Sequence, residues 1–255
     1  MLSDEEKFRF DLEGYLVIPG ALSPFECTQL SKLSDNAWPR QPQDGDFRRT
    51  SQVSQWGEEF RNLMDHPKVL PYLIELIGPR VRLDHDYAIY MQKGAASHAI
   101  HGGPMRYESD HWYHYNDGVI RNGLMVATWA LTDAAPGDGG FVCIPGSHKT
   151  NFINLLPTDA QSQEAMPEYV RQPAVKTGDV ILFTEALMHG TRAWQGDHER
   201  RVLLFKYSPP HSSWAKQGYD LSAYPNATEQ QQRLMAAPSV ERHAKVVDPQ
   251  PQHRR

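Results

Sequence analysis

A change in hydrophobic periodicity after Gly78 constrains the fold of this chain more than any other feature. In VRLDHDYAIYM (residues 81–91), apolar or ring-bearing residues alternate with residues that are mostly charged. A period of two puts alternate side chains on opposite faces of a strand, so the segment predicts a half-buried β-strand. Four further β-rich segments follow, with Gly, Pro, Asp and Asn between them: 123–133, 139–148, 178–190 and 200–209.

The region before this strand is predicted to be mainly helical. Ser23 and Pro24 form an N-cap followed by a first-turn proline, which favours the start of a helix. The run GYLVIPG (residues 14–20) is apolar and bounded by glycines, which indicates a short strand. Helices are expected at residues 4–12, at 24–36 and, in two pieces, within 55–77.

Helices followed by several strands are typical of an antiparallel sandwich or barrel that is braced by helices. We therefore expect a mainly β fold with some α-helix, a double-stranded β-helix or jelly roll, with the N-terminal helices packed on one sheet. A chain of 255 residues fits a single domain of this kind. Its expected parts are a helical region (1–78), a β-helix core (79–210) and a C-terminal lid and tail (211–255) with a helix near 227–236.

Two long polar segments, 104–122 and 149–172, are predicted to be functional loops. The first of them carries several aromatic residues, which suit either a loop that packs on itself or a lid that excludes water from a reaction. We expect residues 104–118, together with 214–240, to close over a bound substrate.

The composition excludes several classes of protein. Hydrophobic residues make up 40% of the chain and the formal net charge is −5, so neither disorder nor binding to a nucleic-acid polymer is indicated. The two cysteines lack metal-ligand spacing and imply no disulfide framework. No apolar run is long enough for a membrane span, and the N-terminal MLSDEEKFRF lacks the basic start of a signal peptide. The expected location is the cytoplasm.

Three residues near strand ends form the strongest chemical pattern. His101 follows one predicted strand, His189 follows the apolar strand GDVILFTEALM, and Arg200 lies eleven residues further on. Histidines on two strands of a double-stranded β-helix can hold one metal ion, and the planar fork of a nearby arginine suits a carboxylate. Imidazole ligands, open metal positions and an arginine are typical of a non-haem Fe(II) site that uses a 2-oxo acid.

The sequence resembles the phytanoyl-CoA dioxygenase family of Fe(II)/2-oxoglutarate-dependent oxygenases over most of its length up to about residue 210. Four segments carry the resemblance in order: FDLEGYLVIPGALSPFEC, YMQKGAASHAIHGG, WALTDAAPGDGGFVCIPGSHK, and GDVILFTEALMHGT followed by RRVLLFKY. Such a match is informative about fold and cofactors and much less so about substrate, because one fold hosts many reactions.

The resemblance implies roles for individual residues. His101 and His189 match the two iron-binding histidines of the family. Arg200 matches the arginine that pairs with the far carboxylate of 2-oxoglutarate, and Thr191 matches a hydroxyl that binds the same carboxylate. Trp129 is expected either in the core or beside 2-oxoglutarate. The implied cofactors are Fe(II), 2-oxoglutarate and O₂.

Gly103 departs from the family pattern, because it stands where the family has its metal-binding aspartate. The pattern His-x-Gly resembles aliphatic halogenases: without the carboxylate, chloride can bind iron as a co-substrate, and chlorination of an unactivated C–H becomes the leading prediction. In that case Gly103 belongs to the catalytic set with the two histidines. Alternatively, Glu108, Asp110 or Asp117 restores a carboxylate and the enzyme is a hydroxylase; His111 and His114 are further spare ligands. In a third interpretation the iron site is dead and the fold is a binding module.

The substrate is expected to be a small molecule. Basic residues near the predicted site mouth suit an anionic group such as a phosphate, and neighbouring aromatic residues suit a nucleotide, although the same residues are also typical of a solvated rim. Oligomeric state cannot be predicted from these features. The predicted substrate residues are Arg106, Tyr107, Trp112, Arg121 and Arg192, with Lys149 a further basic candidate.

Overall fold

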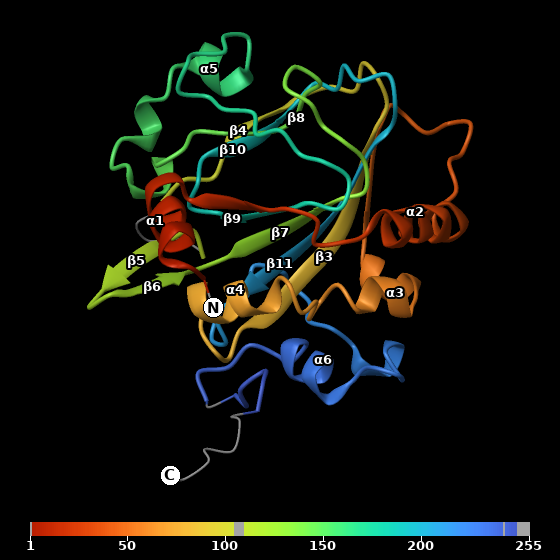
Figure 1. Ribbon diagram of the computed structural model, residues 1–255, viewed down its shortest axis with the longest axis vertical. Helices are drawn as coiled ribbons and strands as arrows, with labels where there is room; N and C mark the ends of the chain where they lie inside the picture. The colour runs from red at the N-terminus through yellow and green to blue at the C-terminus, as the bar shows by residue number, and fades with distance from the viewer. Residues whose placement is uncertain (1, 105–109, 242, 249–255) are drawn as a thin grey trace.

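Two antiparallel sheets face each other in the structure, a computed structural model that describes residues 2–104, 110–241 and 243–248. The large sheet has six strands in the order β1-β9-β7-β11-β3-β2, and the small sheet has three in the order β4-β10-β8. In Figure 1 the small sheet lies above the large one, which is the arrangement of a jelly roll. The predicted fold class, mainly β with helices, is confirmed.

The strands of the large sheet are long in its centre and short at its edges. They are β1 (Tyr15–Ile18), β9 (Val180–Thr184), β7 (Met125–Ala130), β11 (Arg200–Ser208), β3 (Arg82–Met91) and β2 (Phe47–Ser51). The small sheet consists of β4 (His98–His101), β10 (His189–Arg192) and β8 (Gly140–Cys143), and a separate hairpin joins β5 (Tyr113–Asn116) to β6 (Val119–Asn122).

Helices cover the outer face of the large sheet. Both long ones begin with a capping box: Ser3 with Glu6 starts α1 (Asp4–Glu13), and Ser23 with Glu26 starts α2 (Pro24–Ala37). These motifs satisfy backbone N–H groups at the first turn, so local sequence fixes where each helix starts. The shorter helices on this side are α3 (Glu58–Arg61), α4 (Leu70–Leu76) and α6 (Glu229–Leu234), whereas α5 (Thr158–Ser162) lies beside β4 of the small sheet (Figure 1).

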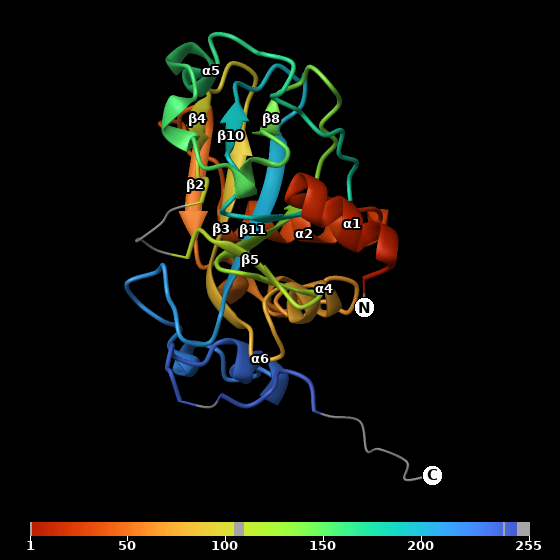
Figure 2. The same ribbon diagram turned by 90° about the vertical axis from the view of Figure 1, so that its left-hand side faces the viewer.

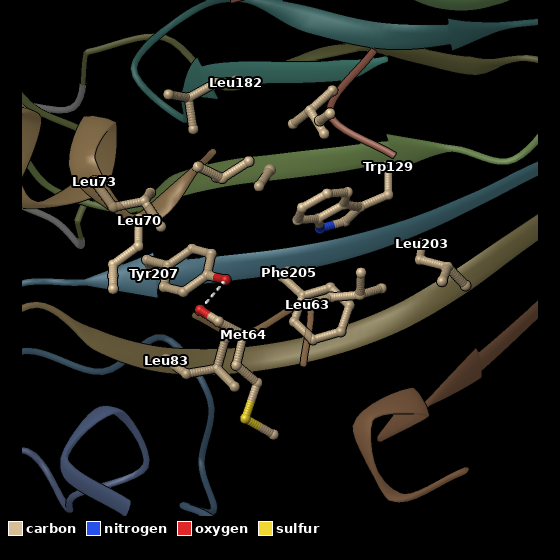
Figure 3. Close-up of a cluster of buried hydrophobic side chains, with 14 of the residues drawn as sticks. Leu63, Met64, Leu70, Leu73, Leu83, Trp129, Leu182, Leu203, Phe205 and Tyr207 are labelled. Atoms are coloured by element: carbon tan, nitrogen blue, oxygen red, sulfur yellow. Dashed lines mark hydrogen bonds between the residues drawn. The ribbon is translucent and has the colours of Figure 1, made fainter. Parts of the chain in front are cut away.

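The alternation along β11 divides the interior into two parts. Leu203, Phe205 and Tyr207 point to the helices, and Figure 3 shows them packed with residues of α4 and of the segment before it. The Tyr207 hydroxyl donates a hydrogen bond of 2.9 Å to the Met64 carbonyl in this core. Val202 and Leu204 point the other way, between the two sheets. The predicted helices and the five predicted β segments are confirmed, with boundaries shifted by a few residues.

Three predictions about the organisation of the chain need correction. The region predicted as helical also contributes β2, a strand without clear alternation, to the edge of the large sheet. The segment 104–122 is not all loop, because its second half forms the β5–β6 hairpin. Helix α6 packs against the helical side, where Gln231 binds Asp65 and Asn62, so it lies far from the small sheet and not over it (Figures 1 and 2). No helix among the described residues is long and apolar enough to cross a membrane.

Candidate active site

The predicted metal-binding histidines lie together. His101 ends β4 and His189 starts β10, and the two are directly opposed in the antiparallel ladder. Their ring centroids are 4.4 Å apart. Both line a cavity of about 290 Å³ between the two sheets, with His189 buried and His101 exposed.

Each of these rings is oriented by a carbonyl group two residues earlier in the chain. Nδ1 of His101 lies 2.9 Å from the Ala99 oxygen, and Nδ1 of His189 lies 2.8 Å from the Leu187 oxygen. A carbonyl only accepts, so Nδ1 carries the proton and donates it, which leaves a lone pair on Nε2. Burial lowers the pKa of His189 to about 4, so its ring is neutral at neutral pH. Neutral imidazoles with Nε2 free and Nδ1–H bonded are the form that binds a metal ion.

Arg200 supplies a buried cation in the same cavity. It lies on the face of β11 that carries Val202, and no carboxylate among the described residues pairs with it; Nη1 reaches only the Met91 sulfur, at 3.5 Å. Burial lowers its pKa to about 10, so the guanidinium remains charged. A buried unpaired charge costs several kcal/mol, which indicates that an anion binds here. The neighbouring Gly140 makes room, because a Cβ there would lie 2.7 Å from the Arg200 Nε.

Two hydroxyl groups accompany Arg200. Thr191, predicted from the sequence, lines the cavity from β10, and Thr128 lines it from β7. The Thr128 hydroxyl is buried and has no hydrogen-bond partner among the described residues, so it is available to a ligand. Trp129 does not line this cavity: it points to the opposite face of β7, into the helix-covered core (Figure 3). There its ring contacts that of His66. Strand alternation therefore places it on the face of β7 away from Arg200.

A buried carboxylate that the sequence analysis did not single out lies beside the histidines. Glu185 Oε2 lies 3.8 Å from the His189 Nε2, and Glu185 Oε1 accepts a 2.5 Å hydrogen bond from Lys206. Burial opposes ionisation of this carboxyl, but the charge and the hydrogen bond of Lys206 outweigh it and lower the pKa of Glu185 to about 2. The signal in the sequence was the i,i+4 spacing of Glu185 and His189, in a segment considered only for its histidine.

Gly103 lies two residues after His101, but a Cβ atom added at Gly103 would not point to His101 or His189. A Cβ at this position would lie 3.0 Å from Cγ2 of Ile153 and 3.2 Å from Cγ of Met188, both apolar, and its φ is +97°. An aspartate here would be strained and directed into the apolar cluster that contains Ile100 and Met188. The backbone therefore does not present a ligand position at residue 103.

The three carboxylates predicted as replacements lie elsewhere or outside the described residues. Asp110 is buried and accepts a 3.1 Å hydrogen bond from the Ser208 hydroxyl, which also donates to Asp84. Asp117 is exposed in the turn of the β5–β6 hairpin, where it binds Asn116. Glu108 lies outside the residues that the structure describes. Among the described residues, no three His, Cys, Asp or Glu side chains stand so that they could hold a metal ion without movement.

The predicted substrate residues are largely used elsewhere. Arg121 donates to the Glu75 carbonyl and lines a separate hollow of about 820 Å³ beside α4, and Lys149 pairs with Asp11. Trp112 packs on His114, and neither it nor Arg192 is among the residues that line the cavity. Arg106 and Tyr107 lie outside the described residues. The basic rim proposed for a phosphate is thus not assembled by these residues.

Other residues, not predicted for a substrate, reach the site. Phe47, Arg49 and His98 line the cavity at the edge strands β2 and β4. His111 lies with Nε2 3.7 Å from the Glu185 Oε2, and its ring stacks on Trp214 at a centroid distance of 5.0 Å. Neither ring nitrogen of His111 has a hydrogen-bond partner among the described residues. Part of the predicted lid, near residue 214, therefore does lie beside the site.

The donor set fits Fe(II) and 2-oxoglutarate. Two neutral imidazoles with free Nε2 atoms suit Fe(II), and a carboxylate completes a common non-haem iron set. An unpaired guanidinium with two hydroxyls suits the far carboxylate of a 2-oxo acid in the same cavity.

Comparison with known proteins gives the same picture. The model of the phytanoyl-CoA dioxygenase (PhyH) family matches residues 10–202. An ectoine dioxygenase of Sphingopyxis alaskensis is 24% identical over 221 residues, which cover 74% of this chain and 70% of that protein. The structure of HygX from Streptomyces hygroscopicus with nickel, 2-oxoglutarate and hygromycin B bound is 27% identical, with a TM-score of 0.74 over 84% of this chain and 90% of that one.

Proposed function

Because the chain belongs to the phytanoyl-CoA dioxygenase family, we propose that this Fe(II)/2-oxoglutarate-dependent oxygenase hydroxylates a C–H bond of a small molecule. The reaction consumes O₂ and 2-oxoglutarate and yields the alcohol, succinate and CO₂. One observation carries the proposal: a single cavity holds two metal-ready histidines and the unpaired guanidinium of Arg200.

His101 and His189 would hold the iron through their Nε2 atoms. When bound, the iron supplies the activation of O₂ at the expense of 2-oxoglutarate. The chain contributes orientation: the carbonyls of Ala99 and Leu187 fix the two rings, and the ladder between β4 and β10 fixes their separation.

Arg200 would bind the far carboxylate of 2-oxoglutarate, with Thr191 and Thr128 donating to the same group. This places the 2-oxo acid between the sheets with its other end toward the histidines. The surrounding side chains of the inter-sheet core, including Phe141 and Phe183, exclude water from this end of the cavity and so strengthen the ionic contact.

The substrate would enter at the edge formed by β2 and β4, where Phe47, Arg49 and His98 line the cavity. The stacked pair His111 and Trp214 forms a further wall next to Glu185. One relative is named as an ectoine dioxygenase, and the HygX structure contains bound hygromycin B. Both compounds are small molecules, so we expect a small polar substrate for this chain.

Halogenation is the second candidate, and the observation that favours it is the absence of a carboxylate at Gly103. Two features weigh against it. The Cβ direction at Gly103 leads to Ile153 and Met188, so the glycine opens no room for chloride beside the histidines. The carboxylate of Glu185 also lies near His189.

The test is substrate-dependent turnover. The purified protein with Fe(II), ascorbate and 2-oxoglutarate is incubated with a panel of small polar metabolites, ectoine and aminoglycosides among them, with and without chloride. We expect succinate release stimulated by one class of substrate and a product heavier by one oxygen, independent of halide. A product that carries chlorine would establish the second candidate, and no succinate with any metal or substrate would contradict both.

A further inference from the structure

We propose that Glu185 supplies the carboxylate ligand that is missing at residue 103. The proposal rests on the proposed function, because it concerns the iron held by His101 and His189. The carboxylate ligand would then come four residues before His189, at Glu185, and not two residues after His101, at position 103.

Position is the first argument. Glu185 lies at the start of the turn from β9 to β10, and its Oε2 is 3.8 Å from the His189 Nε2 and 3.7 Å from the His111 Nε2. Ligand atoms bound at right angles to one ion at about 2.1 Å lie about 3 Å apart, so roughly 1 Å of side-chain movement brings the Glu185 Oε2 to that distance from the His189 Nε2. Such a movement is small for a side chain with three rotatable bonds.

The second argument is the fit between the two chain segments. Gly103 donates its N–H to the Glu185 carbonyl at 3.3 Å. A Cβ on Gly102 would lie 2.8 Å from the Glu185 oxygen and 2.7 Å from the Leu187 oxygen. Gly102, which has no Cβ, therefore lets the end of β4 pack directly on the backbone of residues 185–187.

A buried ion pair fixes the orientation of the Glu185 side chain. Glu185 is 3% exposed, and its Oε1 accepts a 2.5 Å hydrogen bond from Lys206. This contact leaves Oε2 directed toward the histidines. Carboxylates that bind metals are commonly hydrogen-bonded through their second oxygen, which fixes their orientation, and Lys206 would have this positioning role.

Among the described carboxylates, Asp110 is the main competitor and provides a matched control. It is buried like Glu185, and it lies next to His111 in sequence. Its Oδ2, however, accepts from the Ser208 hydroxyl, and it has no ion pair with His101 or His189. If Glu185 is the ligand, changing Asp110 should leave metal affinity as it is.

The experiment is calorimetric titration of the full chain with Ni(II), with no substrate and no turnover. We expect Glu185→Gln to weaken Ni(II) binding by about 100-fold and Asp110→Asn to leave it within about twofold. Unchanged Ni(II) affinity in Glu185→Gln would overturn the assignment. A loss of about 100-fold in Asp110→Asn or in Glu108→Gln, with Glu185→Gln unaffected, would also overturn it. Absence of Ni(II) binding by the unaltered protein would instead overturn the proposed function.

Folding is controlled separately, because Glu185→Gln leaves Lys206 buried without its partner. The double variant Glu185→Met, Lys206→Met removes both charges of the pair, so no buried charge is left unpaired. We expect it to keep the melting temperature of the parent to within a few degrees and still to lose Ni(II) affinity. A folded double variant that binds Ni(II) like the parent would contradict the proposal.

Discussion

His101 and His189 are directly opposed across the β4–β10 ladder, with ring centroids 4.4 Å apart. The main chain of two neighbouring strands therefore sets their separation, and each ring is turned by a carbonyl of its own strand or turn. The fold therefore fixes the positions of both histidines before a metal ion binds. The proposed third ligand, Glu185, is a side chain outside this ladder, so the backbone pairing does not fix its position.

Replacing either histidine should remove the metal. We expect His101→Ala and His189→Ala to abolish both Ni(II) binding and 2-oxoglutarate turnover, because two metal-ready imidazoles become one. Calorimetry and succinate release measure the two effects. His98→Ala is the matched control for Ni(II) binding, since the His98 ring centroid lies 4.8 Å from that of His101 in the same strand but His98 is not assigned as a metal ligand. Full turnover in either histidine variant would contradict the assignment.

Arg200 should control affinity for 2-oxoglutarate alone. We expect Arg200→Ala to raise the KM for 2-oxoglutarate by about 10- to 100-fold, the range for a hydrogen bond to a charged group, while Ni(II) still binds.

Arg201→Ala serves as the control for Arg200. Arg201 points to the opposite face of β11 and pairs with Asp35 and Glu199. A raised KM in Arg201→Ala, with none in Arg200→Ala, would transfer the anchor to Arg201.

Two neighbouring residues of β7 should affect different properties, one the KM for 2-oxoglutarate and the other the stability of the fold. Thr128→Val removes a hydroxyl from the cavity and should raise the KM for 2-oxoglutarate severalfold with little change in stability. Trp129→Phe leaves a void in the helix-covered core and should lower the free energy of unfolding by about 1–3 kcal/mol without changing that KM. Steady-state kinetics and urea unfolding distinguish them. A KM effect confined to Trp129 would restore its predicted place beside 2-oxoglutarate.

Restoring the family aspartate should not create a ligand. Gly103→Asp places a side chain at φ +97° against Ile153 and Met188, and we expect it to destabilise the fold by about 1–3 kcal/mol. Ni(II) affinity should not rise. If the variant instead bound Ni(II) more tightly and a chlorinated product gave way to a hydroxylated one, Gly103 would be a halide position.

Asp84 should make stability depend on acidity. It is buried, and burial opposes its ionisation, but His85, the N–H groups of Trp214 and Ala215, and Arg82 lower its pKa well below the usual value. A carboxylate with a depressed native pKa stabilises the fold above its unfolded pKa, and this contribution is lost as pH falls.

The measurement for Asp84 is the melting temperature as a function of pH. We expect the parent protein to lose stability between about pH 5 and pH 3, and Asp84→Asn to be less stable at pH 7 but to vary less over that interval. Equal pH dependence in the two proteins would show that Asp84 does not contribute.

Periodicity predicted most of the fold because the long central strands are buried on one or both faces. The alternation in 81–91 and the apolar runs at 178–190 and 200–209 are patterns typical of β-strands, and they form β3, β9 and β11. The edge strands β1 and β8 were predicted from their apolar runs, but two other edge strands were missed: β2 reads FRRTS and β4 reads HAIH, and neither has an apolar face of its own. Their pairing is decided by the neighbouring strands, which a local pattern does not contain.

The site was predicted only in part from sequence for a similar reason. His101, His189 and Arg200 lie near the ends of predicted strands and match a family pattern, and the structure brings them to one cavity. Glu185 lies in the turn after β9 and Lys206 lies in β11, so no local spacing could reveal the pair. Of the two places expected for Trp129, the core is the one observed, because its neighbour Thr128, one position earlier, takes the cavity-facing side of β7.

The most direct test is a crystal structure of the protein with Ni(II), 2-oxoglutarate and bromide, with anomalous data for the metal and the halide. We expect the metal on His101 and His189, the far carboxylate of 2-oxoglutarate on Arg200, a carboxylate oxygen of Glu185 on the metal, and no bromide bound to the metal. A metal site away from the two histidines, or 2-oxoglutarate away from Arg200, would contradict the proposed function.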